Sequence, residues 1–296
     1  MNQTYMYALG YFDGVHAGHA ALLQTCRQLA RETGCGCGAV TFTGHPEALL
    51  RGKAPGLINT PEDRKKLLTG QYDMDTVVEL VFDKTMMQTP WQDFLRHLTE
   101  NHNACGFVCG SDFRFGCRGE GTAEHLQAYC REKQLSCWVV EQQKIDGIRV
   151  SSTHIRLLLE QGKVEEAARF LGHPHILSGT VQPGKQLGRT VGMPTANIAY
   201  PDCLLQLPYG VYACRATVEG KTYNALTNVG KRPTVCGESV TAESWLLDFS
   251  GDLYGKTLTL SFYAFIRPEQ KFPDLQQLRR QVENDKFIVE KILPKP

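Results

Sequence analysis

Two histidines lie in a glycine-rich turn near the start of this 296-residue chain, directly after a short apolar stretch. His16 and His19 are three residues apart, so in a helix they would share one face of the first turn. Gly14 and Gly18 let the backbone approach a bound molecule closely, and Val15 is expected to pack. A helix start offers unpaired N–H groups and a positive dipole end, which attract anions. The pattern predicts a site for nucleotide phosphates.

Further polar clusters lie after predicted strands or at the start of a predicted helix. Thr41–Pro46 and Gly110–Gly116 each follow an apolar run, and Val150–Arg156 opens a helical pattern. The hydroxyl groups and arginine of Val150–Arg156 can hold phosphate oxygens at a helix start. The alternative for this cluster is a simple N-cap serine or threonine.

The elements that position these residues alternate through the first half of the chain. Apolar runs predict strands at 7–9, 37–42, 76–82, 104–109 and 138–141, and helical spacing predicts helices from about 17 to Gly34 and at 61–70, 90–101 and 122–134. This alternation is typical of a doubly wound parallel sheet with helices on both faces, a Rossmann-like fold. Ligands of such sheets bind beyond the carboxyl ends of the strands, and Gly10–His19 follows the first strand.

From about Ser178 the apolar residues recur with period two instead. Strands are predicted at 210–218, 241–249 and 256–267, with a short turn at 219–221, which favours an antiparallel β-barrel or sandwich. A last helix at 274–293 should cover the barrel through Leu275, Leu278, Val282, Val289 and Ile292. One helix at 153–171 is expected to connect the halves. We place the domain boundary near residue 175, which predicts domains at 1–175 and 176–296.

Composition limits the function classes. The apolar share of 42% suffices for two cores, and a net charge of +1 gives no electrostatic reason to expect nucleic acid as a partner. No apolar run is long enough to span a membrane, and the first residues lack the basic region of a signal peptide. The eleven cysteines form no Cys-x-x-Cys pair, so reduced thiols are expected rather than zinc or disulfides. A cytoplasmic protein is predicted.

The ordered motifs resemble those of the prokaryotic bifunctional riboflavin kinase and FAD synthetase family over nearly the whole chain. In the first half, the resemblance rests on Phe12–His16 with Gly18 and His19, Asp112–Gly116, and Ser151–Arg156. In the second half, it rests on Gly188-Arg189, Gly192–Asn197, Asn228–Gly230 with Arg232–Thr234, Glu243 six residues before Phe249, and Asp252–Gly255, followed by Arg267, Phe272 and Asp285. The resemblance implies a nucleotidyltransferase domain followed by a riboflavin kinase-like barrel. It also implies ATP, riboflavin and FMN as substrates, Mg²⁺ as cofactor, and leaves a weak homo-oligomer open.

For the first domain, the resemblance implies transfer of AMP from ATP to FMN, which gives FAD and pyrophosphate. His16 and His19 would donate hydrogen bonds to the phosphate oxygens on which charge builds, and Ser152, Thr153 and Arg156 would hold the β and γ phosphates. The nucleotide-binding residues implied here are Gly10, Phe12, Asp13, Gly14, His16, Gly18, His19, Asp112, Ser152, Thr153 and Arg156.

For the second domain, the resemblance implies phosphorylation of the riboflavin 5′-hydroxyl by ATP, with Glu243 as the general base. Thr195 and Asn197 would supply oxygen ligands to Mg²⁺, which prefers such donors. The remaining nucleotide-binding residues implied are Gly188, Gly192 and Pro194, and the flavin-binding residues are Asn228, Arg232, Thr234, Glu243, Arg267 and Phe272. The chain has no Gly-x-x-x-x-Gly-Lys-Ser/Thr pattern, so a P-loop kinase is not expected.

One departure and two alternatives remain. Gly44 stands where the family usually has proline before His45-Pro46, and a glycine loosens that loop. A simpler cytidylyl or pantetheine-phosphate adenylyltransferase would share the histidine turn but would leave the second domain unexplained. A flavin-binding sensor without catalysis would not need a general base at Glu243.

Overall fold

The computed structural model describes residues 3–45, 47, 49, 54–184, 193–234 and 237–296, with the side chains of 232–234, 237 and 238 left out. The described chain divides into two compact units, Met1–Gly56 with Arg64–Ser152, and Leu57–Asp63 with Thr153–Pro296. Leu57 belongs to the second unit because its N–H donates to the Cys203 carbonyl and its own carbonyl accepts from Leu205 N–H, both at 2.8 Å. The functional boundary near residue 175 stays a prediction.

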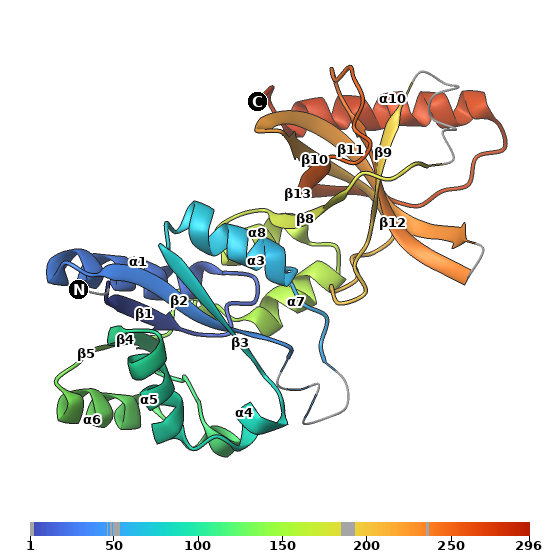
Figure 1. Cartoon of the computed structure of the whole chain (residues 1–296). Coiled ribbons are helices and arrows are strands. Elements are labelled where there is room, and N and C mark those ends of the chain that lie inside the picture. Colours follow the sequence, from blue (N-terminus) through green and yellow to red (C-terminus); the bar gives the residue numbers. More distant parts are fainter. Residues whose placement is uncertain (1–2, 46, 48, 50–53, 185–192, 235–236) are drawn as a thin grey trace. The chain divides into compact units, whose positions relative to one another are not determined.

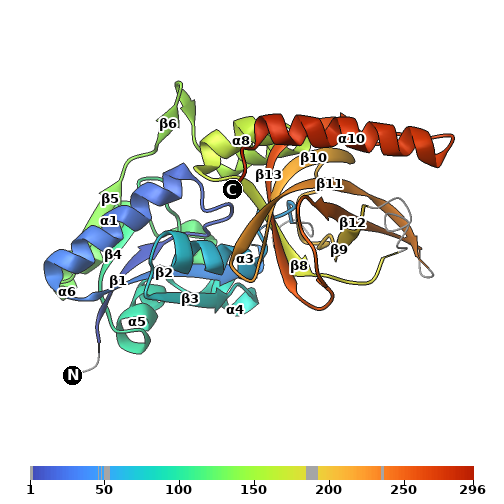
Figure 2. The ribbon, with the colours of Figure 1, turned by 90° about the horizontal axis from the view of Figure 1, so that it is seen from above.

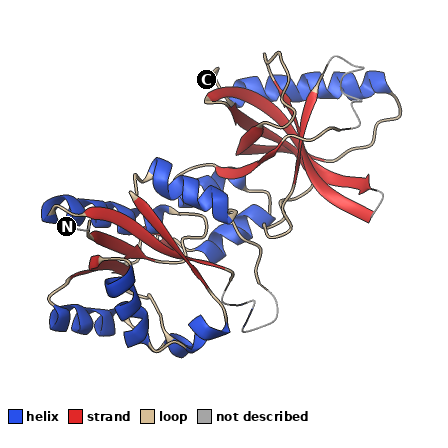
Figure 3. Ribbon diagram, viewed as in Figure 1, coloured by secondary structure: helices blue, strands red, loops and turns tan. Residues whose placement is uncertain are grey.

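The first unit contains a parallel sheet whose described strands lie in the order β3-β2-β1-β4-β5 (Figures 1 and 3). The strands are β1 (Tyr5–Leu9), β2 (Gly36–Thr43), β3 (Thr76–Val81), β4 (Ala104–Gly110) and β5 (Ser136–Val140). Because β1 is central and its neighbours lead away on both sides, its carboxyl end is the point where the strand order reverses. Ligands of open parallel sheets bind at this point. The Rossmann-like expectation is confirmed.

Helices cover both faces of this sheet (Figure 1). They are α1 (Ala17–Thr33), α3 (Pro61–Lys66) continued by the π-helical turn η1 (Leu67–Gln71), α4 (Lys84–Gln88), α5 (Trp91–Asn101), the 3₁₀ turn η2 (Cys117–Gly119) and α6 (Ala123–Lys133). The apolar side of α1 is buried, and Gly34 ends the helix in a left-handed conformation, as its sequence predicts. The opposite face is filled by α5 and α6, which contribute Phe94, Leu98 and Leu126 to one core.

Two local expectations for this unit were incomplete. The helix predicted at 61–70 widens from Leu67 into a π-helical turn, in which Leu67 and Leu68 are buried. A hairpin of β6 (Lys144–Ile145) and β7 (Ile148–Arg149) was not expected. Its turn is Asp146-Gly147, with φ of 51° and 78°, and Asp-Gly between apolar residues is a strong hairpin signal.

The second unit contains an antiparallel sheet, whose strands are red in Figure 3. Within the described residues their order is β8-β13-β10-β11-β12-β9. The strands are β8 (His175–Thr180), β9 (Thr195–Ala199), β10 (Gly210–Val218), β11 (Lys221–Thr234), β12 (Gly237–Leu246) and β13 (Thr257–Pro268). The edges approach each other where Gln182 N–H donates to the Asn197 carbonyl at 2.8 Å. The antiparallel barrel predicted from period-two patterning is confirmed.

The connecting segment forms two helices rather than the single helix predicted at 153–171. They are α7 (Ser152–Glu160) and α8 (Val164–Leu171). Gly162 has a φ of 74°, Lys163 N–H donates to the Leu158 carbonyl, and Gly162 N–H donates to the Leu159 carbonyl. This is the Schellman arrangement, which ends a helix at a left-handed glycine.

The last helix, α10 (Leu275–Ile292), covers one face of the barrel (Figure 2). Val282, Val289 and Leu293 pack with Val211, Leu226 and Ala264 of the strands. Two of the five residues predicted to face the barrel do not, because Leu275 and Ile292 are 57% and 43% exposed. Asp285 is fully buried on this face instead, which an apolar pattern could not show.

A buried histidine inside the barrel leads to a prediction about acid stability. His175 is fully buried on β8 beside Phe262, and neither ring nitrogen has a hydrogen-bond partner among the described residues. Burial, with the nearby His173, lowers the pKa of His175 to about 3. In the unfolded chain, His175 therefore takes up a proton near pH 6.5, whereas in the folded chain it stays neutral. The folded state consequently loses stability as the pH falls. Between pH 8 and 5 this should cost about 2 kcal/mol.

The measurement is denaturant unfolding of the whole chain at pH 8 and pH 5. The H175L variant should lose less stability than the wild type over this interval, by about 2 kcal/mol. H173Q leaves His175 in place and should keep most of the wild-type dependence, because burial is the main cause of the low pKa of His175. An identical pH dependence in H175L and the wild type would contradict a neutral buried imidazole.

Candidate active sites

The loop between β1 and α1 is held in a strained conformation. Phe12 and Val15 are fully buried and have φ of 57° and 39°, a region that costs non-glycine residues about 1–3 kcal/mol. Gly14, with a φ of 82°, adopts this region without that cost. Hydrogen bonds hold the loop at two carbonyls: Tyr11 O accepts from Thr41 Oγ1 at 2.7 Å, and Asp13 O accepts from Ser152 Oγ at 2.9 Å.

The two histidines of this loop are stacked on each other. The rings of His16 and His19 lie 3.6 Å apart with 9° between their planes, and Phe12 meets His19 edge-on at 5.1 Å. His16 is the N-cap of α1, and its Nδ1 accepts from His19 N–H at 3.2 Å. Because Nδ1 is an acceptor, the hydrogen of the neutral His16 ring lies on Nε2.

The charge state of His19 follows from its surroundings. Its Nδ1 is buried and has no hydrogen-bond partner in the part of the chain that the structure describes. Burial, and then the neighbouring His16 and Arg64, hold the pKa of His19 well below its ordinary value. The imidazole is therefore neutral near pH 7 while no anion is bound, and an anion would favour its protonated form.

A cavity of about 780 Å³ opens at the carboxyl end of the sheet beside these rings. Gly10, His16, His19, Asp112 and Ser152 line its polar part. Its apolar part is lined by Phe42, Phe82, Met86, Met87, Phe94, Phe113 and Phe115. One cavity of the first unit thus combines the predicted phosphate-binding loop with a wide apolar surface.

The other predicted residues of this site differ in their positions. Asp112 lines the cavity and forms an ion pair with Arg149, which lines it as well. Ser152 lines the cavity, but its hydroxyl donates to the Asp13 carbonyl and so braces the loop. Thr153 and Arg156 follow Ser152 on α7, Thr153 exposed and Arg156 half-buried.

In the second unit, strand register brings Glu243 together with two asparagines. Glu243 on β12 lies directly opposite Asn197 on β9 and opposite Asn228 on β11, so the three side chains share one face of the sheet. Two residues further along β12, Trp245 packs in the cluster beneath α10, so this is the face that α10 covers. Glu243 is half-buried and has no polar partner among the described residues.

Asn197 carries an unsatisfied oxygen at this position. Its side chain is 5% exposed, and Oδ1 is buried without a hydrogen-bond partner in the described chain, whereas Nδ2 donates to the Thr195 carbonyl at 3.4 Å. Gly184 lies against this amide, since a Cβ there would come within 2.3 Å of Asn197 Nδ2 and 3.1 Å of Oδ1. A buried amide oxygen without a donor suits a cation such as Mg²⁺. Thr195 begins β9 after the exposed Pro194.

The remaining predicted kinase-type residues are only partly described. Gly188 and Gly192 lie outside the described residues, and Arg232 and Thr234 have a described backbone on β11 without side chains. Asn228 Nδ2 donates to Glu269 Oε1 at 3.1 Å. A groove of about 470 Å³ lies beside Trp245 and α10, lined by Met193, Trp245, Arg279, Glu283, Lys286, Phe287 and Glu290.

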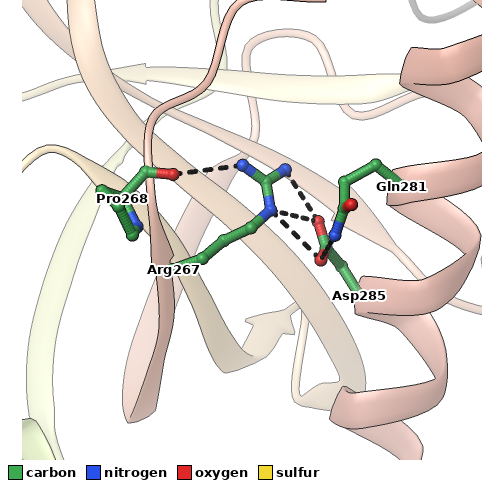
Figure 4. A network of polar contacts seen from close by, with 4 residues as sticks. All are labelled: Arg267, Pro268, Gln281 and Asp285. Carbon is green, nitrogen blue, oxygen red and sulfur yellow. Dashed lines mark hydrogen bonds and ion pairs between the residues drawn. The ribbon is translucent and has the colours of Figure 1, made fainter.

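Arg267, predicted to bind flavin, joins β13 to α10 (Figure 4). Its Nε and a terminal nitrogen donate to Asp285 Oδ2 at 3.0 and 2.8 Å, and Gln281 Nε2 donates to Asp285 Oδ1 at 2.8 Å. The guanidinium also lies over the Phe272 ring, 5.7 Å from its centre. Arg267 therefore fixes the helix and Phe272 at the edge of the expected flavin site.

Breaking this pair should destabilise the second unit. Asp285 is fully buried, and the side chain of Arg267 is 17% exposed, so D285A leaves a largely buried cation without its partner. We expect a loss of about 3–5 kcal/mol in the free energy of unfolding. Chemical denaturation measures it. The exposed pair Lys295–Asp248 is the control, since K295Q should change stability by less than about 0.5 kcal/mol. Equal losses of stability in D285A and K295Q would contradict a stabilising buried ion pair between Arg267 and Asp285.

Sequence patterns did not identify several residues of these sites. Phe42, Phe113 and Phe115 lie within the predicted clusters, but Arg149, Phe82, Met86, Met87 and Phe94 do not. Arg64 is buried near the histidine loop on α3 and looked like one of several charged residues of a surface helix. Arg64 is only 1% exposed, and nothing in the surrounding run of charged residues indicates that this one is buried.

Comparison with known proteins identifies both halves. The family model described as FAD synthetase matches residues 1–154, and the one described as riboflavin kinase matches residues 171–293. A Bacillus subtilis (strain 168) protein named bifunctional riboflavin kinase/FMN adenylyltransferase is 35% identical over 283 residues, 94% of this chain and 89% of that protein. The Escherichia coli (strain K12) protein of the same name is 34% identical over 282 residues, 94% of this chain and 90% of that protein.

A solved structure shares the architecture of the whole chain. The Streptococcus pneumoniae crystal structure described as a macrolide-efflux protein has a TM-score of 0.86 and 30% sequence identity, and the match covers 98% of this chain and 95% of that one. No helix in the described ranges has both the length and the apolar character needed to cross a membrane.

Proposed function

Because the chain belongs to the bifunctional riboflavin kinase/FMN adenylyltransferase family, and so makes FMN and then FAD, we propose how its residues divide the two reactions. The cavity of the first unit would carry the adenylyl transfer, and the α10-covered face of the barrel would carry the phosphorylation. The observation that supports this division is the pair of separate constellations, one with stacked imidazoles and one with a carboxylate between two asparagines.

In the adenylyl step, a phosphate oxygen of FMN attacks the α-phosphorus of ATP, and the bond to pyrophosphate breaks. Negative charge increases on the α-phosphate and on the leaving pyrophosphate, and donors aimed at these oxygens accelerate the step. The Nε2 hydrogen of His16 would serve as such a donor. His19, neutral in the empty site, would gain positive character as the triphosphate approaches, because an anion raises the pKa of an imidazole.

The apolar part of the same cavity would hold the flavin ring of FMN. Phe42, Phe82, Phe94, Phe113 and Phe115 offer flat apolar faces, and aromatic rings stack favourably on one another. The volume of about 780 Å³ falls within the usual range of ligand sites, which is about 300–1,000 Å³. The phosphate of FMN would then point toward the histidine loop. No strong base is needed, since a phosphate oxygen is already ionised.

In the kinase step, the riboflavin 5′-hydroxyl must lose a proton as its oxygen attacks the γ-phosphorus of ATP and ADP leaves. Glu243 would accept this proton, and its half-buried carboxylate without a polar partner in the described chain is suited to that role. Asn228 and Asn197, directly opposite on both sides, would orient the hydroxyl and the phosphates. The groove beside Trp245 and α10 would receive the flavin ring.

Mg²⁺ would be held by Asn197 Oδ1 and the Thr195 hydroxyl, together with substrate phosphates. The buried Oδ1 of Asn197, which has no hydrogen-bond partner among the described residues, fits a hard cation. Bound Mg²⁺ would neutralise charge on the triphosphate. We also propose the functional boundary near residue 175. A cytoplasmic location remains our prediction, supported by the use of ATP.

The test is incubation of the purified chain with riboflavin and Mg-ATP, followed by separation of the flavins. FMN and then FAD should accumulate, and supplied FMN should give FAD without riboflavin. A simpler nucleotidyltransferase would give neither product from riboflavin. A flavin sensor would bind riboflavin and return it unchanged.

A further inference from the structure

A buried arginine lies directly behind the histidine loop of the first unit. Arg64, 1% exposed near the end of α3, donates from one terminal nitrogen to Tyr11 O at 3.0 Å and from the other to Phe42 O at 2.8 Å. Its guanidinium carbon is 5.0 Å from the centre of the Tyr11 ring. It therefore connects the strained β1–α1 loop to the end of β2, two segments that line the cavity.

The charge of Arg64 has no anionic partner in the described part of the chain. Both of its hydrogen bonds end on backbone carbonyls, and its buried Nε has no partner there. Asp63, its neighbour in sequence, accepts from Ser178 N–H at 3.1 Å within the second unit. Burying a cation without a counter-charge is costly, and an anion bound nearby would offset that cost.

The loop that Arg64 holds is the one whose conformation is strained. Tyr11 precedes Phe12, the first of the residues with positive φ, and Tyr11 O accepts from both Arg64 and Thr41 Oγ1. Strained residues persist only where surrounding contacts over-determine them. Burial is the largest cause of the low pKa of His19, and the charges of His16 and then Arg64 lower it further, so the cation of Arg64 acts electrostatically on an imidazole that lines the cavity.

We propose that Arg64 is a positioning residue for adenylyl transfer: it holds the β1–α1 loop in its phosphate-binding form, and the substrate phosphates balance its charge. This inference rests on the proposed adenylyl function of the cavity. Arg64 does not line the cavity, so it acts through Tyr11 and the histidine loop rather than by touching substrate.

The experiment compares R64M, which keeps much of the side-chain volume without charge, with R64K, which keeps the charge. In R64M, kcat for FAD formation from FMN should fall about 100-fold or more, and KM for Mg-ATP should rise less, because charge increases most in the transition state. R64K should recover part of the lost activity, because lysine keeps the positive charge but lacks the planar guanidinium group that donates to two carbonyls. The riboflavin kinase activity of the same chains should not change, because it belongs to the second unit, and thermal unfolding checks that the first unit stays folded.

A second measurement separates positioning from mere structural support. NMR titration of the His19 ring in the ligand-free chain should give a higher pKa in R64M than in the wild type, and R64K should restore a low pKa. K65M is the control, because the adjacent Lys65 is exposed and pairs with Glu79. It should leave both activities and the His19 titration unchanged.

The outcomes distinguish this inference from the function on which it rests. A wild-type chain that makes no FAD from FMN would overturn the proposed function itself. An active wild type with R64M equally active would overturn the role of Arg64. Equal losses in R64M and R64K, with an unchanged His19 pKa, would overturn it too and leave Arg64 a structural residue.

Discussion

Replacing Glu243 with glutamine is expected to stop the conversion of riboflavin to FMN, while FAD still forms from supplied FMN. Glutamine keeps the size of the side chain but cannot accept a proton, and general-base catalysis contributes about 10²–10⁴ in rate. Glu243 lies on β12 in the second unit, and the histidine loop lies in the first. Initial rates of FMN and FAD formation, each from its own substrate, measure the two effects separately.

A matched carboxylate variant serves as the control for this prediction. Glu219 is 66% exposed at the β10–β11 turn and pairs with Lys256, so E219Q should keep both activities. If E243Q lost both activities while remaining folded, the assignment of one reaction to each unit would be wrong. An E243Q enzyme that phosphorylated riboflavin at the wild-type rate would show that another group takes the proton.

The positions of the site loops could be predicted because they depend on local pattern. A strand followed by glycines and a helix start places Gly10–His19 at the carboxyl end of β1, and the structure has this arrangement. The period-two runs gave β10 with the bounds expected, Gly210–Val218. The break at Gly162 was missed because apolar spacing continues across it, and one glycine does not reveal whether its φ is positive.

The mutual arrangement of the site residues could not be predicted in the same way. Asn197, Asn228 and Glu243 meet through strand register, and a shift of one residue would turn each side chain to the opposite face. The pairing of Arg267 with Asp285 likewise depends on how α10 packs against β13. Charged residues on a helix are ordinarily solvated, so Arg64 and Asp285 look unremarkable until burial is known.

His16 allows the chemical role of an imidazole to be separated from its role as a helix cap. In H16N, asparagine should still cap α1, because its side-chain oxygen accepts a backbone N–H as His16 Nδ1 does from His19. The donor to the phosphates is lost, and we expect FAD formation from FMN to fall about 10²–10³-fold, as when one transition-state donor is removed elsewhere. Riboflavin phosphorylation should continue. Steady-state rates of both reactions and thermal unfolding measure the result.

H16A and H97Q complete this comparison. Alanine removes the donor and the cap together, so H16A should lose as much adenylyl transfer as H16N and in addition about 1 kcal/mol of stability. His97 is exposed on α5 and outside the cavity lining, so H97Q should change neither activity. If H16N retained wild-type FAD formation while H16A lost it, the cap rather than the imidazole would matter, and the phosphate donor would have to be sought elsewhere in the loop.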